Sequence, residues 1–202
     1  MLIDIEESQL VLVDYQSGLE GAMQDAQVVW HNATVLARLA RQLDVPVLGT
    51  EQNPSRLGAM PDGLRACCSR VLAKMHFSAV EEGLGEWLRP PAEPPRGNAR
   101  SLPRHLQKPP GGSPVRNTVI LAGCEAHVCL LQTALDLLDD EFDVCVVTDA
   151  CASRTERNRD AAFDRLAGAG AELVTTEMVA FEWIRSAEHP HFKFMQSLIK
   201  SA

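Results

Sequence analysis

Short runs of consecutive apolar residues, separated by segments with helical spacing, constrain the fold of this chain most. The runs are LVLV (10–13), PVLGT (46–50), TVILAG (118–123), DVCVVTD (143–149) and AELVTT (171–176), with a shorter one at RVLAK (70–74). Strands without polar alternation are buried on both faces, which is typical of a parallel sheet covered by helices. The runs therefore predict a mainly parallel six-stranded sheet.

The segments between the runs favour helices on both faces of that sheet. Apolar residues recur at helical spacing in three long segments, 22–43, 126–139 and 155–168, and two short helices are expected at about 178–186 and 190–201. Thr155 can cap the third of these helices, and Gly170 follows its end. Alternating strands and helices with right-handed crossovers predict a three-layer, doubly wound, Rossmann-like α/β fold. The 202 residues fit a single domain spanning 1–202.

Residues 89–116 interrupt this pattern. They contain eight of the twelve prolines, six basic residues and one acidic residue, in a chain whose net charge is −8. Proline and glycine at this density disfavour a packed helix or strand, so we expect a flexible surface insertion. A lid or an arm that binds a partner is the alternative interpretation.

Charge and composition exclude several classes of partner. A net charge of −8 gives no general attraction for nucleic acid or for anionic membranes, so we expect neither as a partner. No apolar stretch approaches the roughly 20 residues that cross a bilayer. The N-terminal sequence MLIDIEESQLVLVDYQ resembles neither a signal peptide nor a transit peptide. We therefore expect a cytoplasmic protein with reduced thiols and a small-molecule substrate.

The ends of the predicted strands carry the candidate site, because ligands of open α/β sheets bind beyond the carboxyl ends of the strands. LVLV runs into Asp14, RVLAK ends at Lys74, and Cys129 lies one turn into the helix after TVILAG. Glu51, Gln52, Cys124, Glu125 and Asp149 also follow strand runs. An acid, a lysine and a thiol are thus predicted at one edge of the sheet.

These three side chains have complementary chemistry. A free thiol has a pKa of about 8.5, and a helix N-terminus together with an ammonium group favours the thiolate. Asp14 can accept the proton of Cys129, and Lys74 can keep Asp14 ionised. Backbone N–H groups between Glu125 and Cys129 can form an oxyanion hole. Structural roles are the alternatives: a loop cap for Asp14, a surface position for Lys74 and a core position for Cys129.

The motifs LVLVDYQ, KMHFSA and GCEAHVCLLQTALDLL resemble those of the isochorismatase-like hydrolases, also called the cysteine hydrolase superfamily. TEQNPSRLG, VVTDACASR and AEHPHFKFMQSLIK are similar to the patterns of isochorismatase domain-containing proteins. The resemblance implies the isochorismatase-like hydrolase fold and a triad of Asp14, Lys74 and Cys129, with Cys129 as the nucleophile. It further implies a cis peptide bond before Glu125, whose N–H helps to bind the oxyanion, and assembly into a homo-oligomer, a dimer or a tetramer.

The sequence predicts neither a metal nor an organic cofactor. Metal-dependent nicotinamidases of the superfamily carry an Asp-x-His motif where this chain has TEQNPSRLG, which contains no histidine. The six cysteines form no CxxC pair, and the phosphate-binding patterns GxGxxG and GxxxxGK[ST] are both absent.

The leading hypothesis is a cysteine-dependent hydrolase of a small amide or ester that works through a thioester. Four residues near the triad in sequence are candidates for the substrate pocket: Gln16, Gln52, Phe77 and His127. One alternative is a non-catalytic module of the same fold that binds a partner through residues 89–116. Another is an isochorismate-type vinyl-ether hydrolase that uses Asp14 and Lys74 without the thiol.

Overall fold

A six-stranded parallel sheet forms the centre of the protein, as predicted. The computed structural model describes residues 2–90 and 116–200, so most of the predicted insertion at 89–116 lies outside the described residues. The strand order is β3-β2-β1-β4-β5-β6, and every neighbouring pair is parallel. The strands are β1 (Ser8–Val13), β2 (Val47–Gln52), β3 (Arg70–Lys74), β4 (Thr118–Cys124), β5 (Asp143–Ala152) and β6 (Glu172–Val174).

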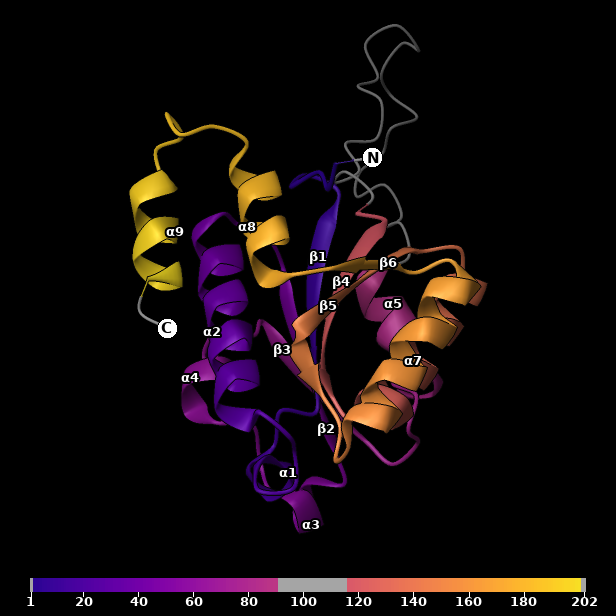
Figure 1. The fold of residues 1–202 in the computed structure, drawn as a ribbon. Coiled ribbons are helices and arrows are strands. Elements are labelled where there is room, and N and C mark those ends of the chain that lie inside the picture. The colour runs from indigo at the N-terminus through magenta and orange to yellow at the C-terminus, as the bar shows by residue number, and fades with distance from the viewer. Residues whose placement is uncertain (1, 91–115, 201–202) are drawn as a thin grey trace, which may run out of the picture.

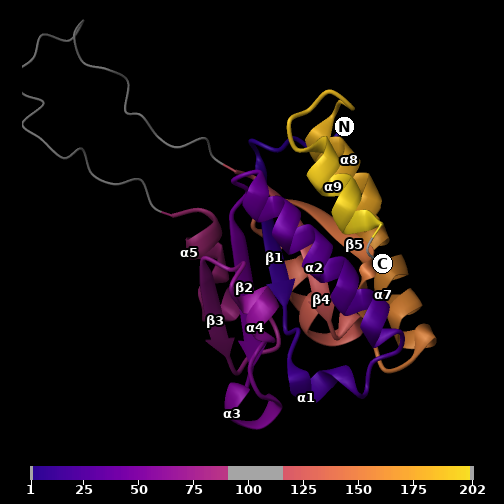
Figure 2. The same cartoon turned by 90° about the vertical axis from the view of Figure 1, so that its left-hand side faces the viewer.

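Helices cover both faces of the sheet, which gives three layers (Figure 1). One face is covered by α2 (Ala26–Gln42), α4 (Asp62–Arg65), α8 (Thr176–Ile184) and α9 (Phe192–Ile199). The other face is covered by α5 (Leu84–Leu88), α6 (Leu131–Asp139) and α7 (Glu156–Ala169). Figure 2 shows α2 lying along the sheet, with the short helices α1 (Ser17–Glu20) and α3 (Pro54–Leu57) at one end.

The alternation of side chains along each strand divides the apolar interior into two cores. In β1, Leu10 and Leu12 pack on the side of α2, whereas Val11 and Val13 pack on the side of α6. All six residues of β1 and of β2 are buried, in agreement with runs that lack polar alternation. Strand β3 lies at the edge of the sheet, and most of its residues are at least partly exposed.

Two of the three long helices begin differently from the sequence prediction. Helix α2 begins at Ala26 instead of 22, because Asp25 adopts a left-handed conformation (φ 52°) that cannot continue a helix. The predicted helix at 126–139 begins with a π-helical turn, η4 (Ala126–Leu130), before α6. Helix α7 follows the prediction: the Thr155 hydroxyl accepts a hydrogen bond from the N–H of Asn158, and Gly170 ends the helix at φ 106°.

The described residues that flank the predicted insertion lie at the amino-terminal edge of the sheet. The side-chain amide of Gln9, near the start of β1, donates hydrogen bonds to the carbonyls of Leu88 and Arg116. Asp14 and Lys74 lie at the opposite, carboxyl-terminal edge. Within the ranges 2–90 and 116–200, no helix combines the length and apolarity needed to cross a membrane.

Candidate active site

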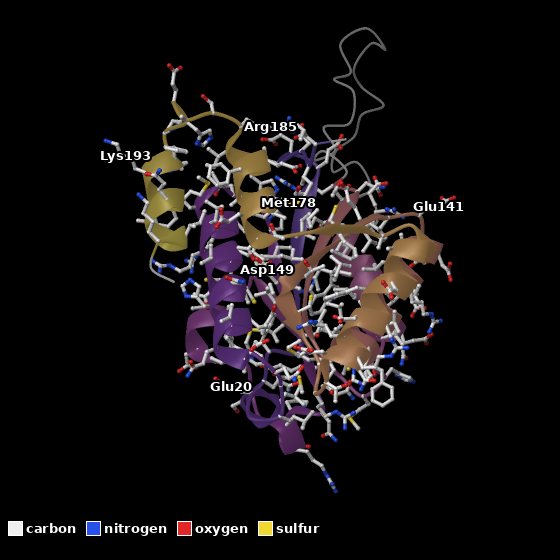
Figure 3. All side chains as sticks on the ribbon, in the orientation of Figure 1. Glu20, Glu141, Asp149, Met178, Arg185 and Lys193 are labelled. Atoms are coloured by element: carbon white, nitrogen blue, oxygen red, sulfur yellow. The ribbon has the colours of Figure 1, made fainter. Side chains whose placement is uncertain are left out.

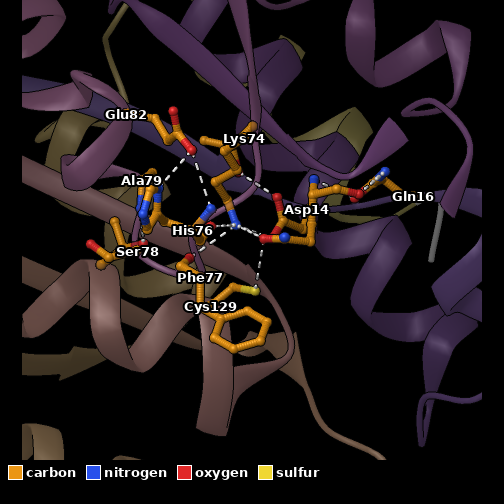
Figure 4. Close-up of polar contacts among 12 residues, drawn as sticks. Asp14, Gln16, Lys74, His76, Phe77, Ser78, Ala79, Glu82 and Cys129 are labelled. Atoms are coloured by element: carbon orange, nitrogen blue, oxygen red, sulfur yellow. Dashed lines mark hydrogen bonds and ion pairs between the residues drawn. The ribbon is translucent and has the colours of Figure 1, made fainter. Parts of the chain in front are cut away.

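A buried ion pair joins the ends of two strands that are not neighbours. Asp14 directly follows β1, Lys74 is the last residue of β3, and β2 lies between these strands. The Lys74 Nζ atom is 2.8 Å from Asp14 Oδ2, and both side chains are 0% exposed (Figure 4). The Thr50 hydroxyl donates a hydrogen bond of 2.7 Å to Asp14 Oδ1. The carboxylate of Asp14 therefore has a partner on each oxygen.

The ammonium group of Lys74 is surrounded by further acceptors. Its Nζ atom lies 2.6 Å from Gln52 Oε1, 2.9 Å from the carbonyl oxygen of Phe77 and 3.4 Å from that of His76. An ammonium group has three N–H donors and no acceptor, so this environment suits the charged form. Paired acceptors of this kind are what a fully buried lysine requires, because an unpaired buried charge is costly.

The thiol of Cys129 lies beside this ion pair. Cys129 belongs to η4 and is 6% exposed, and its Sγ atom is 3.8 Å from Gln52 Oε1. The amide oxygen of Gln52 therefore faces both Lys74 and the thiol. The predicted convergence of Asp14, Lys74 and Cys129 at one edge is present in the structure.

The surroundings of Cys129 do not favour the thiolate that the sequence led us to expect. Burial, and after it the charge of Asp14, raise the pKa of the Cys129 thiol to about 12, while Lys74 acts in the opposite direction. Sequence reasoning counted the helix N-terminus and the ammonium but could not include the loss of solvent around the sulfur. At neutral pH the side chain of Cys129 is therefore a protonated thiol.

The segment between β4 and η4 forms the second side of the site. The peptide bond between Cys124 and Glu125 is cis, as the resemblance implies. A Cβ atom at Gly123 would overlap the carbonyl of Val13, so glycine lets β4 lie close to the end of β1. The Glu125 carboxylate accepts a hydrogen bond of 2.7 Å from Nε of Arg154, a residue that precedes α7. The oxyanion-binding role of the N–H groups of Glu125 and Cys129 stays a prediction.

The four predicted pocket residues differ in their placement. Gln52 contacts the ion pair and the thiol directly. Gln16 is fully buried, and its side-chain amide forms hydrogen bonds with the N–H and the carbonyl of Gln52 and with the carbonyl of Gly58. Gln16 therefore holds the backbone of Gln52 in place. Phe77 is 51% exposed, next to the ion pair, and His127 is partly buried in η4. Their contact with a substrate remains a prediction.

Sequence reasoning missed the residues that hold His127. Its Nδ1 atom lies 3.0 Å from the hydroxyl of Ser153, and its Nε2 atom lies 3.3 Å from Nδ2 of Asn158. Ser153 reaches the site because β5 continues to Ala152, three residues beyond the apolar run DVCVVTD. No feature of that run shows where the strand ends.

Asp149 was predicted at the same edge as the triad, but its carboxylate has a structural role at the start of α8. Leu121 of β4 pairs with Val146 of β5, and the next pair is Gly123 with Cys151. Strand β5 therefore has more residues than β4 between these two pairs, which makes it irregular at this point. Asp149 lies in this irregular stretch, and its Oδ1 atom accepts hydrogen bonds from the N–H and the hydroxyl of Thr176, at the start of α8 (Figure 3). A bulge of this kind leaves no simple sequence pattern.

Among the described residues, the remaining thiols and the acidic groups form no second candidate site. All six cysteines are free, and Cys124, Cys145 and Cys151 are buried in the apolar cores. In the part of the chain that the structure describes, no three histidine, cysteine or acidic side chains are grouped so that they could hold a metal ion.

The doubly wound parallel sheet, with a buried aspartate, lysine and cysteine at its carboxyl edge, defines an isochorismatase-like α/β protein. A family model described as the isochorismatase domain matches residues 112–178. Isochorismatase domain-containing protein 2 from Rattus norvegicus is 36% identical over 195 residues, which cover 96% of this chain and 82% of the rat protein. The chain therefore belongs to the isochorismatase family.

Two solved structures show the same fold. The MAR1 ribonuclease from Caenorhabditis elegans matches with a TM-score of 0.81 and 29% identity, covering 99% of this chain and 93% of that one. The YcaC protein from Escherichia coli matches with a TM-score of 0.75 and 23% identity, covering 100% of this chain and 96% of that one. YcaC is described as an octameric hydrolase of unknown specificity.

Proposed function

We propose that this protein is a cysteine-dependent hydrolase of a small, uncharged amide or ester, with Asp14, Lys74 and Cys129 as its catalytic triad. The observation that carries the proposal is the fully buried ion pair of Asp14 and Lys74 beside the Cys129 thiol. Membership of the isochorismatase family supports the hydrolase class.

In the first half-reaction Asp14 acts as the general base. Each carboxylate oxygen carries two lone pairs, so pairing with Lys74 leaves Asp14 able to accept the proton of Cys129. The sulfur attacks the carbonyl carbon, and the carbonyl oxygen becomes an oxyanion that the N–H groups of Glu125 and Cys129 stabilise. The C–N bond then breaks, the leaving amine takes the proton from Asp14, and a thioester on Cys129 remains.

In the second half-reaction water hydrolyses that thioester. Asp14 accepts a proton from the attacking water, the carbon–sulfur bond breaks, and the proton returns to Cys129. Lys74 keeps its charge throughout and holds Asp14 and Gln52 in place. The charges of this ion pair balance each other, which favours an uncharged substrate over an ionic one.

A panel of small amides with ammonia detection, together with the activated ester p-nitrophenyl acetate, tests the proposal. Cys129→Ala should abolish turnover, and Cys124→Ala, which removes a buried thiol outside the triad, should retain it. Turnover that survives in Cys129→Ala would instead favour vinyl-ether hydrolysis without the thiol. An intact protein that neither turns over any of these compounds nor forms an adduct on Cys129 would favour the non-catalytic module.

RNA is not the substrate that we propose, although one structural neighbour is named a ribonuclease. The net charge of this chain is −8, and the site lysine is fully buried and paired with Asp14. Binding of RNA phosphates requires accessible cationic groups. Cleavage of a labelled single-stranded RNA that is lost in Cys129→Ala would contradict this choice.

We also propose that residues 1–202 form one domain with an inserted segment at 89–116, and that the protein is a cytoplasmic homo-oligomer. The octameric description of YcaC supports self-association of this fold. Analytical ultracentrifugation of the purified protein should give a dimer or a tetramer. A monomer at micromolar concentration would contradict the assembly proposal.

A further inference from the structure

The turn at residues 75–79, which follows Lys74, lies between the site and an acidic side chain that no motif identified. At the start of the turn, Glu82 Oε1 accepts hydrogen bonds from the N–H of Met75 (3.0 Å) and from the N–H of His76 (3.2 Å). The same oxygen lies 2.9 Å from Nδ1 of His76. One carboxylate oxygen therefore binds three donors of the first two residues of the turn.

The carbonyl groups of the same residues point the other way, into the site. The carbonyls of His76 and Phe77 accept from the ammonium of Lys74, at 3.4 Å and 2.9 Å. The carbonyl of Met75 accepts from the side-chain amide of Gln52 at 2.8 Å. Figure 4 shows Glu82 and Cys129 on opposite sides of Lys74 and this turn.

Hydrogen bonds rather than packing hold the start of the turn. Met75 is 65% exposed and Phe77 is 51% exposed, so neither side chain is anchored in a core. The far end is fixed separately on α6, where the hydroxyl of Thr133 accepts from the N–H of Ala79 and the carboxylate of Asp136 accepts from Ser78. The orientation of the carbonyls that face Lys74 thus depends on Glu82 at one end and on α6 at the other.

We infer that Glu82 is a positioning residue of the active site, because it fixes the turn whose carbonyls hold the ammonium of Lys74. The inference rests on the proposed function of Asp14, Lys74 and Cys129. The bound N–H of Met75, followed by the imidazole of His76, lowers the pKa of Glu82 to about 2. The carboxylate is therefore charged at any pH at which the enzyme would be assayed.

Glu82→Ala, Glu82→Gln and the exposed neighbour variant Glu81→Ala separate a positioning role from a structural one. We expect Glu82→Ala to lower kcat/KM for p-nitrophenyl acetate by about 10- to 100-fold, the effect of misplacing a catalytic group by a fraction of an ångström to an ångström. Glu82→Gln retains an acceptor oxygen and should lose less, and Glu81→Ala should match the wild type.

A second readout does not depend on turnover. Amine labelling of the folded protein with trinitrobenzenesulfonate, read by peptide mass spectrometry, should modify Lys74 faster in Glu82→Ala than in the wild type and in Glu81→Ala. Unchanged kcat/KM together with unchanged protection of Lys74 would overturn the inference. If Glu82→Ala does not fold, the same comparison is made with Glu82→Ser, whose side chain is too short to reach the donors of Met75 and His76, and wild-type protection of Lys74 in that variant would overturn the inference.

The two readouts also separate the inference from the proposed function. A wild-type protein without turnover would contradict the proposed function, and the labelling of Lys74 would then decide the positioning role alone. Wild-type turnover with equal labelling and equal kcat/KM in all variants would leave the proposed function intact and remove Glu82 from it. A loss of thermal stability in Glu82→Ala without either effect would show that Glu82 is only structural.

Discussion

Asp14→Asn removes the base that the proposed mechanism requires while keeping the shape of the site. Asp14 has a left-handed backbone conformation (φ 53°), which asparagine tolerates as well as aspartate does. The asparagine oxygen can accept from Lys74, and its amide can donate to the hydroxyl of Thr50, which then accepts instead of donating. The variant should therefore fold, so a loss of activity reports on the missing carboxylate.

The size of the loss follows from the pKa of Cys129. A thiol pKa of about 12 lies about five units above neutral pH, so without a base only about one thiol in 10⁵ is ionised. Asp14 itself raises this pKa, so its removal lowers the value and makes that fraction a lower limit. We therefore expect a loss of acylation rate of about 10²- to 10⁴-fold, the range typical of general base catalysis.

The acylation rate of Asp14→Asn should also depend on pH differently from that of the wild type. In Asp14→Asn the reactive thiolate forms by ionisation alone, so the acylation rate should rise about tenfold for each unit of pH up to the thiol pKa. Stopped-flow release of p-nitrophenolate, measured from neutral to alkaline pH, follows this step, with Asp14→Asn/Cys129→Ala as the blank for background hydrolysis. A variant that stays within about threefold of the wild type, with the same pH profile, would refute Asp14 as the base.

Two further substitutions test the surroundings of the thiol. Lys74→Met leaves the fully buried carboxylate of Asp14 without its ammonium partner, so it should lower the free energy of unfolding in urea by about 3–5 kcal/mol, and combining it with Asp14→Asn should restore part of this loss. A cost of under about 1 kcal/mol would contradict the buried ion pair. Gln52→Met removes the amide that bonds both Lys74 and the carbonyl of Met75, so it should cost about 1–3 kcal/mol in the same assay and slow the acylation of Cys129. Wild-type values for both quantities would exclude Gln52 from the network.

The fold was predictable because buried parallel strands leave a direct pattern in the sequence. The apolar runs locate all six strands, and β3 was found from only five residues, Arg70–Lys74. The same logic located Asp14 and Lys74, because the carboxyl ends of parallel strands meet at one edge. The helix after β4 then placed Cys129 at that edge.

Other features of the site depend on long-range geometry that the sequence does not show. The carboxylate of Asp149 bonds to Thr176 at the start of α8, and β5 continues past Asp149 to Ala152, so that Ser153 contacts His127 instead. The resting state of Cys129 depends on burial by residues distant in the chain, so local reasoning about the helix N-terminus gave the wrong direction for its pKa. The role inferred for Glu82 depends on a turn whose backbone N–H groups happen to face it, and side-chain type alone does not predict that.

An acyl group on the sulfur of Cys129 is the central claim, and acid-quenched mass spectrometry after mixing with p-nitrophenyl acetate measures it directly. The account predicts a burst of one p-nitrophenolate per active site, with an acetyl group on Cys129 that fragmentation distinguishes from Cys124, Cys145 and Cys151, and no burst in Cys129→Ala. Steady turnover of the ester without an acetylated Cys129, or an equal burst in Cys129→Ala, would contradict it.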